Sequence, residues 1–325
     1  MRSPPDADCD CCPAEREPDV SGVEALPAPD LPSWLETLLV PGTRRYVVPV
    51  DGQLLHVMET GPKDGRPVLC VHGNPTWGFL WRKVAAELEG SSLRVVMPDL
   101  VGLGLSSKPR DPDAHTLRAH FAWLRGLVRA LDLRGVVLAL QDWGGAVGTG
   151  AFLDDRDRLA GLVVLNTVLG PPQPGFRPTL FHLSAHIAGV SDLLFRTLGF
   201  PQNVINFAQG DRRSISGPVA RAYRWPLRGR TRNAGPLGLT RMVPDTMEHP
   251  SVPALRDVAD FIAGWDGPSA IVWGRRDPIL GRLERRTMRV LPQAPLTATE
   301  AGHFLQEEVP AEIASAVRDV VSRSG

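Results

Sequence analysis

Short runs of consecutive apolar residues alternate with helical patterns from residue 45 to the end of the chain. Four segments built on such runs lie at residues 68–72 (VLCVH), 94–98 (RVVMP), 136–140 (VVLAL) and 162–165 (LVVL). They lack the alternation of apolar and polar residues that marks a strand with one solvated face. Strands covered on both faces read in this way, and helices between them make such strands parallel. The pattern therefore predicts an α/β fold, a mostly parallel sheet with helices on both faces.

The elements at both ends of the sheet follow from the same patterns. Asp51 and Gly52 separate two apolar runs at residues 45–50 and 54–60, which is typical of a hairpin of antiparallel strands. Further elements are expected as strands at residues 270–273 and 296–299 and as helices at residues 79–88, 117–131, 145–152, 282–291 and 304–322.

Residues 168–262 interrupt this alternation, because they contain many Pro and Gly residues and several helical patterns but no clear strand. We interpret this block as a helical cap inserted into the core domain. The core domain then consists of residues 34–167 and 263–325. A cap over the carboxyl ends of parallel strands closes a pocket at the edge where ligands bind in such folds.

The N-terminal residues 1–33 are rich in Pro, Asp, Glu and Ala and are expected to form a disordered tail. Three of the four Cys residues lie there, as Cys9, Cys11 and Cys12, without a fourth ligand at a zinc-like spacing. The tail has no apolar segment of the kind that forms a secretory signal, so we expect a cytoplasmic protein.

The charge balance excludes several classes of partner. Lys and Arg total 36 and Asp and Glu total 36, and no basic block stands out, which argues against nucleic acid as a partner. No apolar run approaches the ~18 residues of a membrane span, so no membrane partner is expected.

The segment VVLALQDWGGAVG, residues 136–148, carries the strongest chemical signal. A strand runs into Asp142, and small residues such as Gly144 and Gly145 then open a helix. This order is typical of a nucleophile elbow, with Asp in place of the usual Ser. A carboxylate nucleophile displaces a leaving group from saturated carbon and forms an ester. The alternative is that Asp142 caps the N-terminus of the helix.

A loop with the sequence HGNPTW follows the strand at residues 68–72 and places Asn74 after a His-Gly pair. Beside a nucleophile elbow, backbone N–H donors come from this loop and from the residue after the nucleophile, here Trp143. Both residues also carry side-chain N–H groups, which together could bind an anionic leaving group. The alternative is a turn at Asn74 and a structural Trp143.

His303 follows the last predicted strand, and the order of nucleophile, acid and His is that of hydrolases with a nucleophile elbow. This placement predicts a general base that activates water against the ester. Asp277 lies four residues beyond the strand that ends at Trp273, where it can hold the imidazole. The other position for this acid, after residues 162–165, holds Asn166, and the alternative for Asp277 is a solvated loop residue. The remaining His residues show no metal-ligand spacing, and no metal is expected.

Five segments together resemble the haloalkane dehalogenases: HGNPTW (72–77), PDLVGLGLSSKP (98–109), QDWGG (141–145), GRRDPILG (274–281) and AGHFLQEE (301–308). RAYRWP (221–226) and LTRMVP (239–244) resemble the cap of that family, so the resemblance runs from residue 34 to the end. It implies an α/β-hydrolase fold with an eight-stranded sheet and a helical cap.

By this resemblance, the catalytic residues are the nucleophile Asp142, the base His303 and the acid Asp277, and the halide-binding pair is Asn74 and Trp143. An Asp acid with an Asn–Trp pair is similar to the third subfamily, whose members are described as weakly active and prone to associate. The implied reaction converts a haloalkane and water into an alcohol, a halide ion and a proton, without a cofactor.

Three other functions remain open from the sequence. An epoxide hydrolase would use the same type of nucleophile but commonly needs two cap tyrosines, whereas this chain has only Tyr46 and Tyr223. An esterase would need Ser at position 142. A non-catalytic scaffold would keep the fold for binding alone. The sequence leaves the oligomeric state open.

Overall fold

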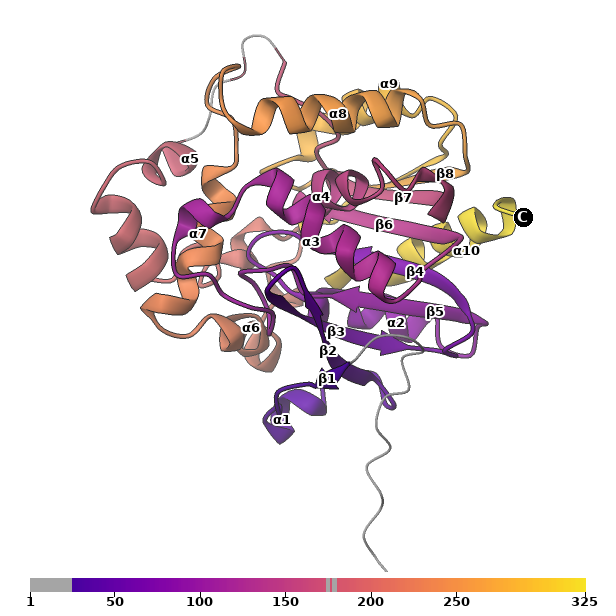
Figure 1. Ribbon diagram of the computed structural model, residues 1–325, viewed down its shortest axis with the longest axis horizontal. Helices are drawn as coiled ribbons and strands as arrows, with labels where there is room; N and C mark the ends of the chain where they lie inside the picture. The colour runs from indigo at the N-terminus through magenta and orange to yellow at the C-terminus, as the bar shows by residue number, and fades with distance from the viewer. Residues whose placement is uncertain (1–24, 174–175, 177–179) are drawn as a thin grey trace, which may run out of the picture.

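The computed structural model describes residues 25–173, 176 and 180–325, which form one nine-stranded sheet in the order β1-β2-β3-β5-β4-β6-β7-β8-β9 (Figure 1). The strands are β1 (Leu26–Pro27), β2 (Arg44–Val50), β3 (Gln53–Thr60), β4 (Arg66–Val71), β5 (Leu93–Pro98), β6 (Val136–Asp142), β7 (Leu159–Thr167), β8 (Ser269–Gly274) and β9 (Leu296–Thr299). Strands β4 to β9 pair in parallel, whereas β1, β2 and β3 pair antiparallel. The mostly parallel α/β sheet predicted from the apolar runs is therefore confirmed.

The sheet has nine strands where eight were expected, and β1 lies in the segment assigned to the N-terminal tail. Leu26 pairs with Val47 of β2, and Leu31 is buried a few residues later. The sequence around β1 alternates Leu, Pro and Ala, and Pro is compatible with a strand only at the edge of a sheet, where β1 is found. Cys9, Cys11 and Cys12 lie outside the described residues.

The predicted hairpin is confirmed as β2 and β3, in which Val50 pairs with Gln53. Asp51 and Gly52 both have positive φ, at 47° and 75°. A two-residue turn with both central residues in this region matches the right-handed twist of the strands that it joins.

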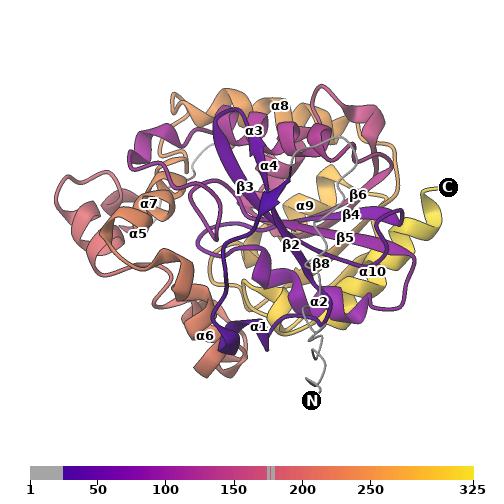
Figure 2. The same ribbon diagram turned by 60° about the horizontal axis from the view of Figure 1, so that its bottom comes forward.

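Helices cover both faces of the sheet. Along β6, Leu138 packs in one hydrophobic cluster with α3, α4 and α8, whereas Val137 packs in the other with α2 and α10. Figure 2 shows these two helical layers on opposite sides of the strands. The helices outside the cap are α1 (Ser33–Glu36), α2 (Arg82–Glu87), α3 (Leu117–Ala130), α4 (Trp143–Ala151), α8 (Ser251–Ala263), α9 (Glu284–Val290) and α10 (Pro310–Arg323).

The segment between β7 and α8 contains α5 (Leu180–Ser184), α6 (Gly217–Arg224) and α7 (Ala234–Arg241), joined by short helical turns. These helices lie together at one end of the molecule in both views (Figures 1 and 2). Helix α8 lies almost entirely inside the range predicted for the cap, yet it packs against α4 and α3, and its Leu255 and Val258 belong to the hydrophobic cluster of the core. The boundary placed at residue 262 therefore includes one helix of the core.

None of the helices in the described part of the chain is long and apolar enough to span a membrane.

The packing of α8 is testable by truncation of one side chain. Leu255 is 1% exposed in the cluster that α8 shares with α4, so Leu255→Ala leaves a core cavity. We expect the free energy of unfolding to fall by about 2–5 kcal/mol, measured by denaturant titration. The control is Leu183→Ala on α5, where the side chain is 41% exposed and the loss should stay below ~1 kcal/mol. Equal losses would contradict a core role for α8.

Candidate active site

The turn from β6 into α4 carries Asp142 in a strained conformation. Asp142 has φ 52° and ψ −126°, a combination that non-glycine residues rarely adopt. Two glycines let the turn pack tightly, because a Cβ atom on Gly144 would lie 2.1 Å from the carbonyl oxygen of Val71, and one on Gly145 would lie 1.9 Å from Thr167 Oγ1. The Thr167 hydroxyl donates to the carbonyl of Asp142. The turn therefore presents the Asp142 side chain at the carboxyl end of the sheet.

The two carboxylate oxygens of Asp142 have different neighbours. Oδ1 accepts a hydrogen bond of 2.8 Å from the backbone N–H of Asn74, and Oδ2 lies 3.4 Å from Nε2 of His303. The side chain is 16% exposed. It accepts no hydrogen bond from the first turn of α4, so the alternative in which Asp142 caps that helix is wrong.

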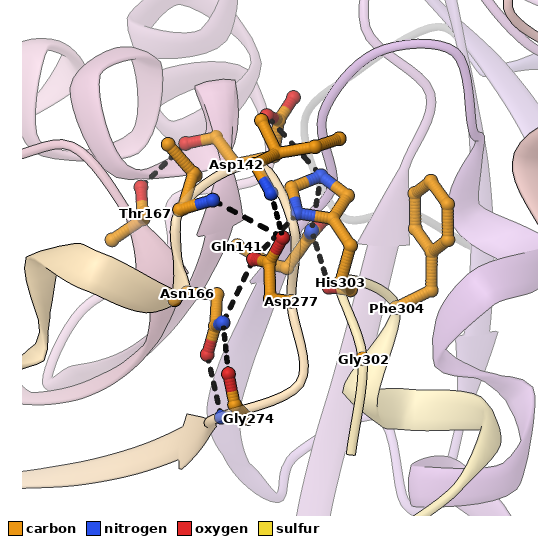
Figure 3. A network of polar contacts seen from close by, with 12 residues as sticks. Gln141, Asp142, Asn166, Thr167, Gly274, Asp277, Gly302, His303 and Phe304 are labelled. Atoms are coloured by element: carbon orange, nitrogen blue, oxygen red, sulfur yellow. Dashed lines mark hydrogen bonds and ion pairs between the residues drawn. The ribbon is translucent and has the colours of Figure 1, made fainter. Parts of the chain in front are cut away.

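The imidazole of His303 lies between two carboxylates (Figure 3). Nδ1 is 2.9 Å from Oδ2 of Asp277, and Nε2 faces Asp142. Burial alone would lower the pKa of His303, but the charges and hydrogen bonds of Asp277 and Asp142 outweigh it and raise the pKa to about 10. The geometry orients Nδ1 toward Asp277 and Nε2 toward Asp142.

Asp277 is a buried residue of the loop after β8, not a solvated one. Its Oδ1 accepts the backbone N–H groups of Ile279 and Leu280 at 2.7 and 3.1 Å. Its Oδ2 accepts a hydrogen bond from Nδ2 of Asn166 at 2.8 Å and lies 2.9 Å from Nδ1 of His303. Burial would raise the pKa of this carboxyl, but the charge of His303 and these donors lower it below the ordinary value. Asp277 is thus held as an ion in a fixed orientation.

Asn166 has a role that sequence reasoning missed. It is the second-last residue of β7, and from the sequence it was considered only as a position without an acid. Its Oδ1 accepts the N–H of Gly274 at 2.8 Å, and its Nδ2 donates to the carbonyl of Gly274 and to Asp277, both at 2.8 Å (Figure 3). The amide therefore ties the acid to the end of β8. The only sequence signal was a polar residue at the end of an apolar strand.

The side chain of Asn74 is bound by the cap. Its Nδ2 donates to the carbonyl of Pro236 and to Oγ1 of Thr240 on α7, each at 3.1 Å. Trp143, the first residue of α4, is half-buried against the core cluster. Across residues 25–173, 176 and 180–325, no group accepts a hydrogen bond from its indole N–H. The structure therefore brings Asp142, His303, Asp277 and the backbone of Asn74 together.

In the described part of the chain, no group of three or more His, Cys, Asp or Glu side chains is placed to hold a metal ion.

A buried Asp–His–Asp cluster with one Asp on a strained strand-to-helix turn is the arrangement of an α/β hydrolase. The sequence model of the family described as alpha/beta hydrolase fold matches residues 66–310. A haloalkane dehalogenase of Mycobacterium marinum is 33% identical over 266 residues, which cover 81% of this chain and 87% of that protein. The chain belongs to the haloalkane dehalogenases, hydrolases that act on carbon–halogen bonds.

Solved structures agree with this assignment. A variant of the haloalkane dehalogenase DatA from Agrobacterium tumefaciens superposes with a TM-score of 0.78 at 25% identity, covering 88% of this chain and 99% of that one. The haloalkane dehalogenase DpaA from Paraglaciecola agarilytica, described as tetrameric, has a TM-score of 0.73 at 26% identity, with coverage of 90% and 97%.

The electrostatics of the cluster can be tested by titration. Asp277 contributes more than Asp142 to the raised pKa of His303, so Asp277→Asn should lower that pKa more than Asp142→Asn does. Nuclear magnetic resonance of the imidazole nitrogens across pH 5–11 measures the three values. Two results would contradict the described charge arrangement: a His303 pKa of ~6.5 in the unchanged protein, or the same His303 pKa in the unchanged protein and both variants.

Proposed function

We propose that Asp142 attacks the halogen-bearing carbon of a haloalkane and that His303, oriented by Asp277, activates the water that hydrolyses the resulting ester. The observation that carries this proposal is the position of one buried imidazole, with Nε2 3.4 Å from Asp142 and Nδ1 2.9 Å from Asp277. The products are an alcohol, a halide ion and a proton.

In the first step, Oδ2 of Asp142 forms a bond to carbon while the carbon–halogen bond breaks and the halide leaves with the electron pair. Oδ1 becomes the carbonyl oxygen of the ester. Because the Asn74 N–H already binds Oδ1 at 2.8 Å, it is placed to stabilise the negative charge that this oxygen takes when water adds.

The first step also changes the charge around the base. Conversion of Asp142 to an ester removes one of the two carboxylates that raise the pKa of His303 to about 10. The pKa therefore falls, and the imidazole releases a proton to solvent. Neutral Nε2 then takes a proton from water as the hydroxide adds to the ester carbonyl. The bond from this carbon to the alkyl-bearing oxygen breaks, the new carboxyl group gives its proton to the departing alkoxide, and the alcohol leaves while Asp142 is again a carboxylate.

This sequence predicts a pH dependence for ester hydrolysis. His303 must be neutral in the ester intermediate, so the rate of hydrolysis should rise as the pH increases through its pKa there. That apparent pKa should lie below the value of about 10 in the free enzyme. Rapid-quench measurement of alcohol release in a single turnover, after the halide burst has formed the ester, gives the rate of hydrolysis at each pH. A rate that falls with rising pH over this range would exclude neutral His303 as the base.

Asn74 and Trp143 are proposed to bind the departing halide through their side-chain N–H groups. Two observations support this pair: the Trp143 indole N–H makes no hydrogen bond to the described residues, and the backbone N–H of Asn74 places that residue beside Asp142. The Asn74 side chain donates its N–H groups to Pro236 and Thr240, so binding of the halide requires it to exchange one of these contacts. Donors aimed at a leaving group act mainly on the charge that develops in the transition state.

Trp143→Phe should lower the rate of halide release about 10²–10³-fold, the effect of removing one donor from a developing anion. The loss should be larger for a chloroalkane than for the matching bromoalkane, since chloride depends more on stabilisation as it leaves. Stopped-flow halide detection measures both rates. A variant that keeps full activity with both substrates would remove Trp143 from the halide site.

The two tyrosines count against the epoxide hydrolase alternative. The hydroxyl of Tyr223 is buried and donates to Oε1 of Glu307 at 2.5 Å, and burial, with Glu307 next to it, raises its pKa well above 10. Tyr46 donates to Glu59 at 2.8 Å and is buried on β2. Neither hydroxyl is placed to protonate an opening epoxide. This favours a haloalkane over an epoxide as the substrate.

The acid at Asp277, with Asn74 and Trp143 as the halide pair, supports membership of the third subfamily. The buried contact of Asp277 with His303, and an amide at Asn166 where another acid could stand, favour this placement.

The deciding experiment is halide release from short bromo- and chloroalkanes, with styrene oxide hydrolysis as a parallel assay. Asp142→Asn should abolish halide release. His303→Phe should release one halide per enzyme and retain an alkyl adduct on Asp142, visible by mass spectrometry. Sustained turnover by Asp142→Asn would refute the mechanism. Diol formation that is lost in Tyr223→Phe would establish an epoxide hydrolase instead.

A further inference from the structure

A cap segment, residues 208–211, lies directly on the loop that carries His303. The carbonyl of Ala208 accepts the backbone N–H of His303 at 2.8 Å. The side chain of Gln209 binds both backbone groups of Phe304, the residue after His303. Its Oε1 accepts the N–H of Phe304 at 2.9 Å, and its Nε2 donates to the carbonyl of Phe304 at 3.2 Å. Gln209 is itself 6% exposed. The cap thus supplies three hydrogen bonds to the backbone around the imidazole.

Two further features hold the same surfaces together. The carboxylate of Glu308 accepts backbone N–H groups from Gly210 and Asp211 at 3.0 Å and from Gly302 at 3.3 Å. A Cβ atom on Gly302 would lie 2.3 Å from the carbonyl oxygen of Ala208. The two segments are therefore in backbone contact, and Gly302 is required for that approach.

Among the described residues, the core contributes one side-chain hydrogen bond to the backbone of His303. Nε2 of Gln141 donates to the His303 carbonyl at 3.0 Å (Figure 3). Since buried backbone groups need partners, removal of the cap contacts would leave the N–H groups of His303 and Phe304 unpaired. The loop would then move to find new partners, and the imidazole would move with it.

We infer that cap residues 208–211 position the catalytic base, with Gln209 as the main positioning residue, so that ester hydrolysis depends on these contacts more than ester formation does. The inference rests on the proposed role of His303. Asp142 is held by the β6–α4 turn and by Asn74, which make no hydrogen bond to Gln209. Displacement of a catalytic group by ~1 Å costs about 10²-fold in rate, so a small shift of the loop affects the second step.

The test separates the two steps in Gln209→Leu, which removes both contacts to Phe304 at similar side-chain volume. With a bromoalkane, we expect the initial halide burst to stay within ~3-fold and the steady-state rate to fall about 10–100-fold. The alkyl adduct on Asp142 should accumulate during turnover, as seen by mass spectrometry. A merely structural role would lower both steps together and leave no adduct.

The matched control is Gln202→Leu. Gln202 is a cap glutamine with 4% exposure that donates to Asn233 at 3.0 Å, within the cap and away from the base loop. This variant should leave the ratio of the initial halide burst rate to the steady-state rate unchanged. Glu308→Gln is the second variant if Gln209→Leu does not fold, because it weakens the contacts to Gly210 and Asp211 from the other side and should shift the balance in the same direction.

The outcomes distinguish this inference from the mechanism on which it depends. If His303→Phe accumulates no adduct, the proposed role of His303 is wrong. If it does accumulate adduct while Gln209→Leu and Glu308→Gln leave the two rates in their original ratio, the positioning role of residues 208–211 is wrong. Adduct in Gln202→Leu as well would also refute it, since any damage to the cap would then have the same effect.

Discussion

One buried imidazole between two carboxylates is the interaction on which the rest of the site depends. Burial of His303, Asp277 and part of Asp142 carries a desolvation cost, which is offset only if every charge has partners. The neighbouring residues supply them: the N–H groups of Ile279 and Leu280 and the amide of Asn166 on Asp277, and the N–H of Asn74 on Asp142. These donors also fix the positions of the two carboxylates relative to the imidazole. The same hydrogen bonds therefore stabilise the buried charges and orient the side chains.

The cap takes part in this arrangement at three places. Helix α7 binds the side chain of Asn74, residues 208–211 bind the loop of His303, and Tyr223 of α6 binds Glu307, which also pairs with Arg82 of α2. Each contact joins the cap to a core segment next to the site. The cap is therefore part of the framework that positions the residues of the candidate site.

The sequence predicted the features that depend on local pattern. Runs of apolar residues located the central strands, and the small residues after Asp142 located the turn into α4. The edge strand β1 was missed because two residues among prolines carry no strand pattern, and α8 was assigned to the cap because an amphipathic helix does not reveal which domain it covers. Asn166 and Gln209 were missed for another reason. They bind backbone groups about 100 residues away, as in the Asn166–Gly274 and Gln209–Phe304 contacts, and such pairings leave no local signal.

In the proposed mechanism, a carboxylate nucleophile allows the loop that carries His303 to affect ester hydrolysis without affecting ester formation. A Ser nucleophile needs its base in the first step, because a hydroxyl must lose its proton as it attacks, whereas a carboxylate is ionised without help at neutral pH. A His303 that stays protonated beside two carboxylates is therefore compatible with attack by Asp142, and its charge is not an obstacle until water must be activated. Alkylation then removes the carboxylate charge that favours the protonated form. In the proposed mechanism, the contacts that hold the His303 backbone matter most after this change, when the neutral imidazole is oriented by Asp277 at Nδ1 and by the Gln141 amide 3.3 Å from Nε2.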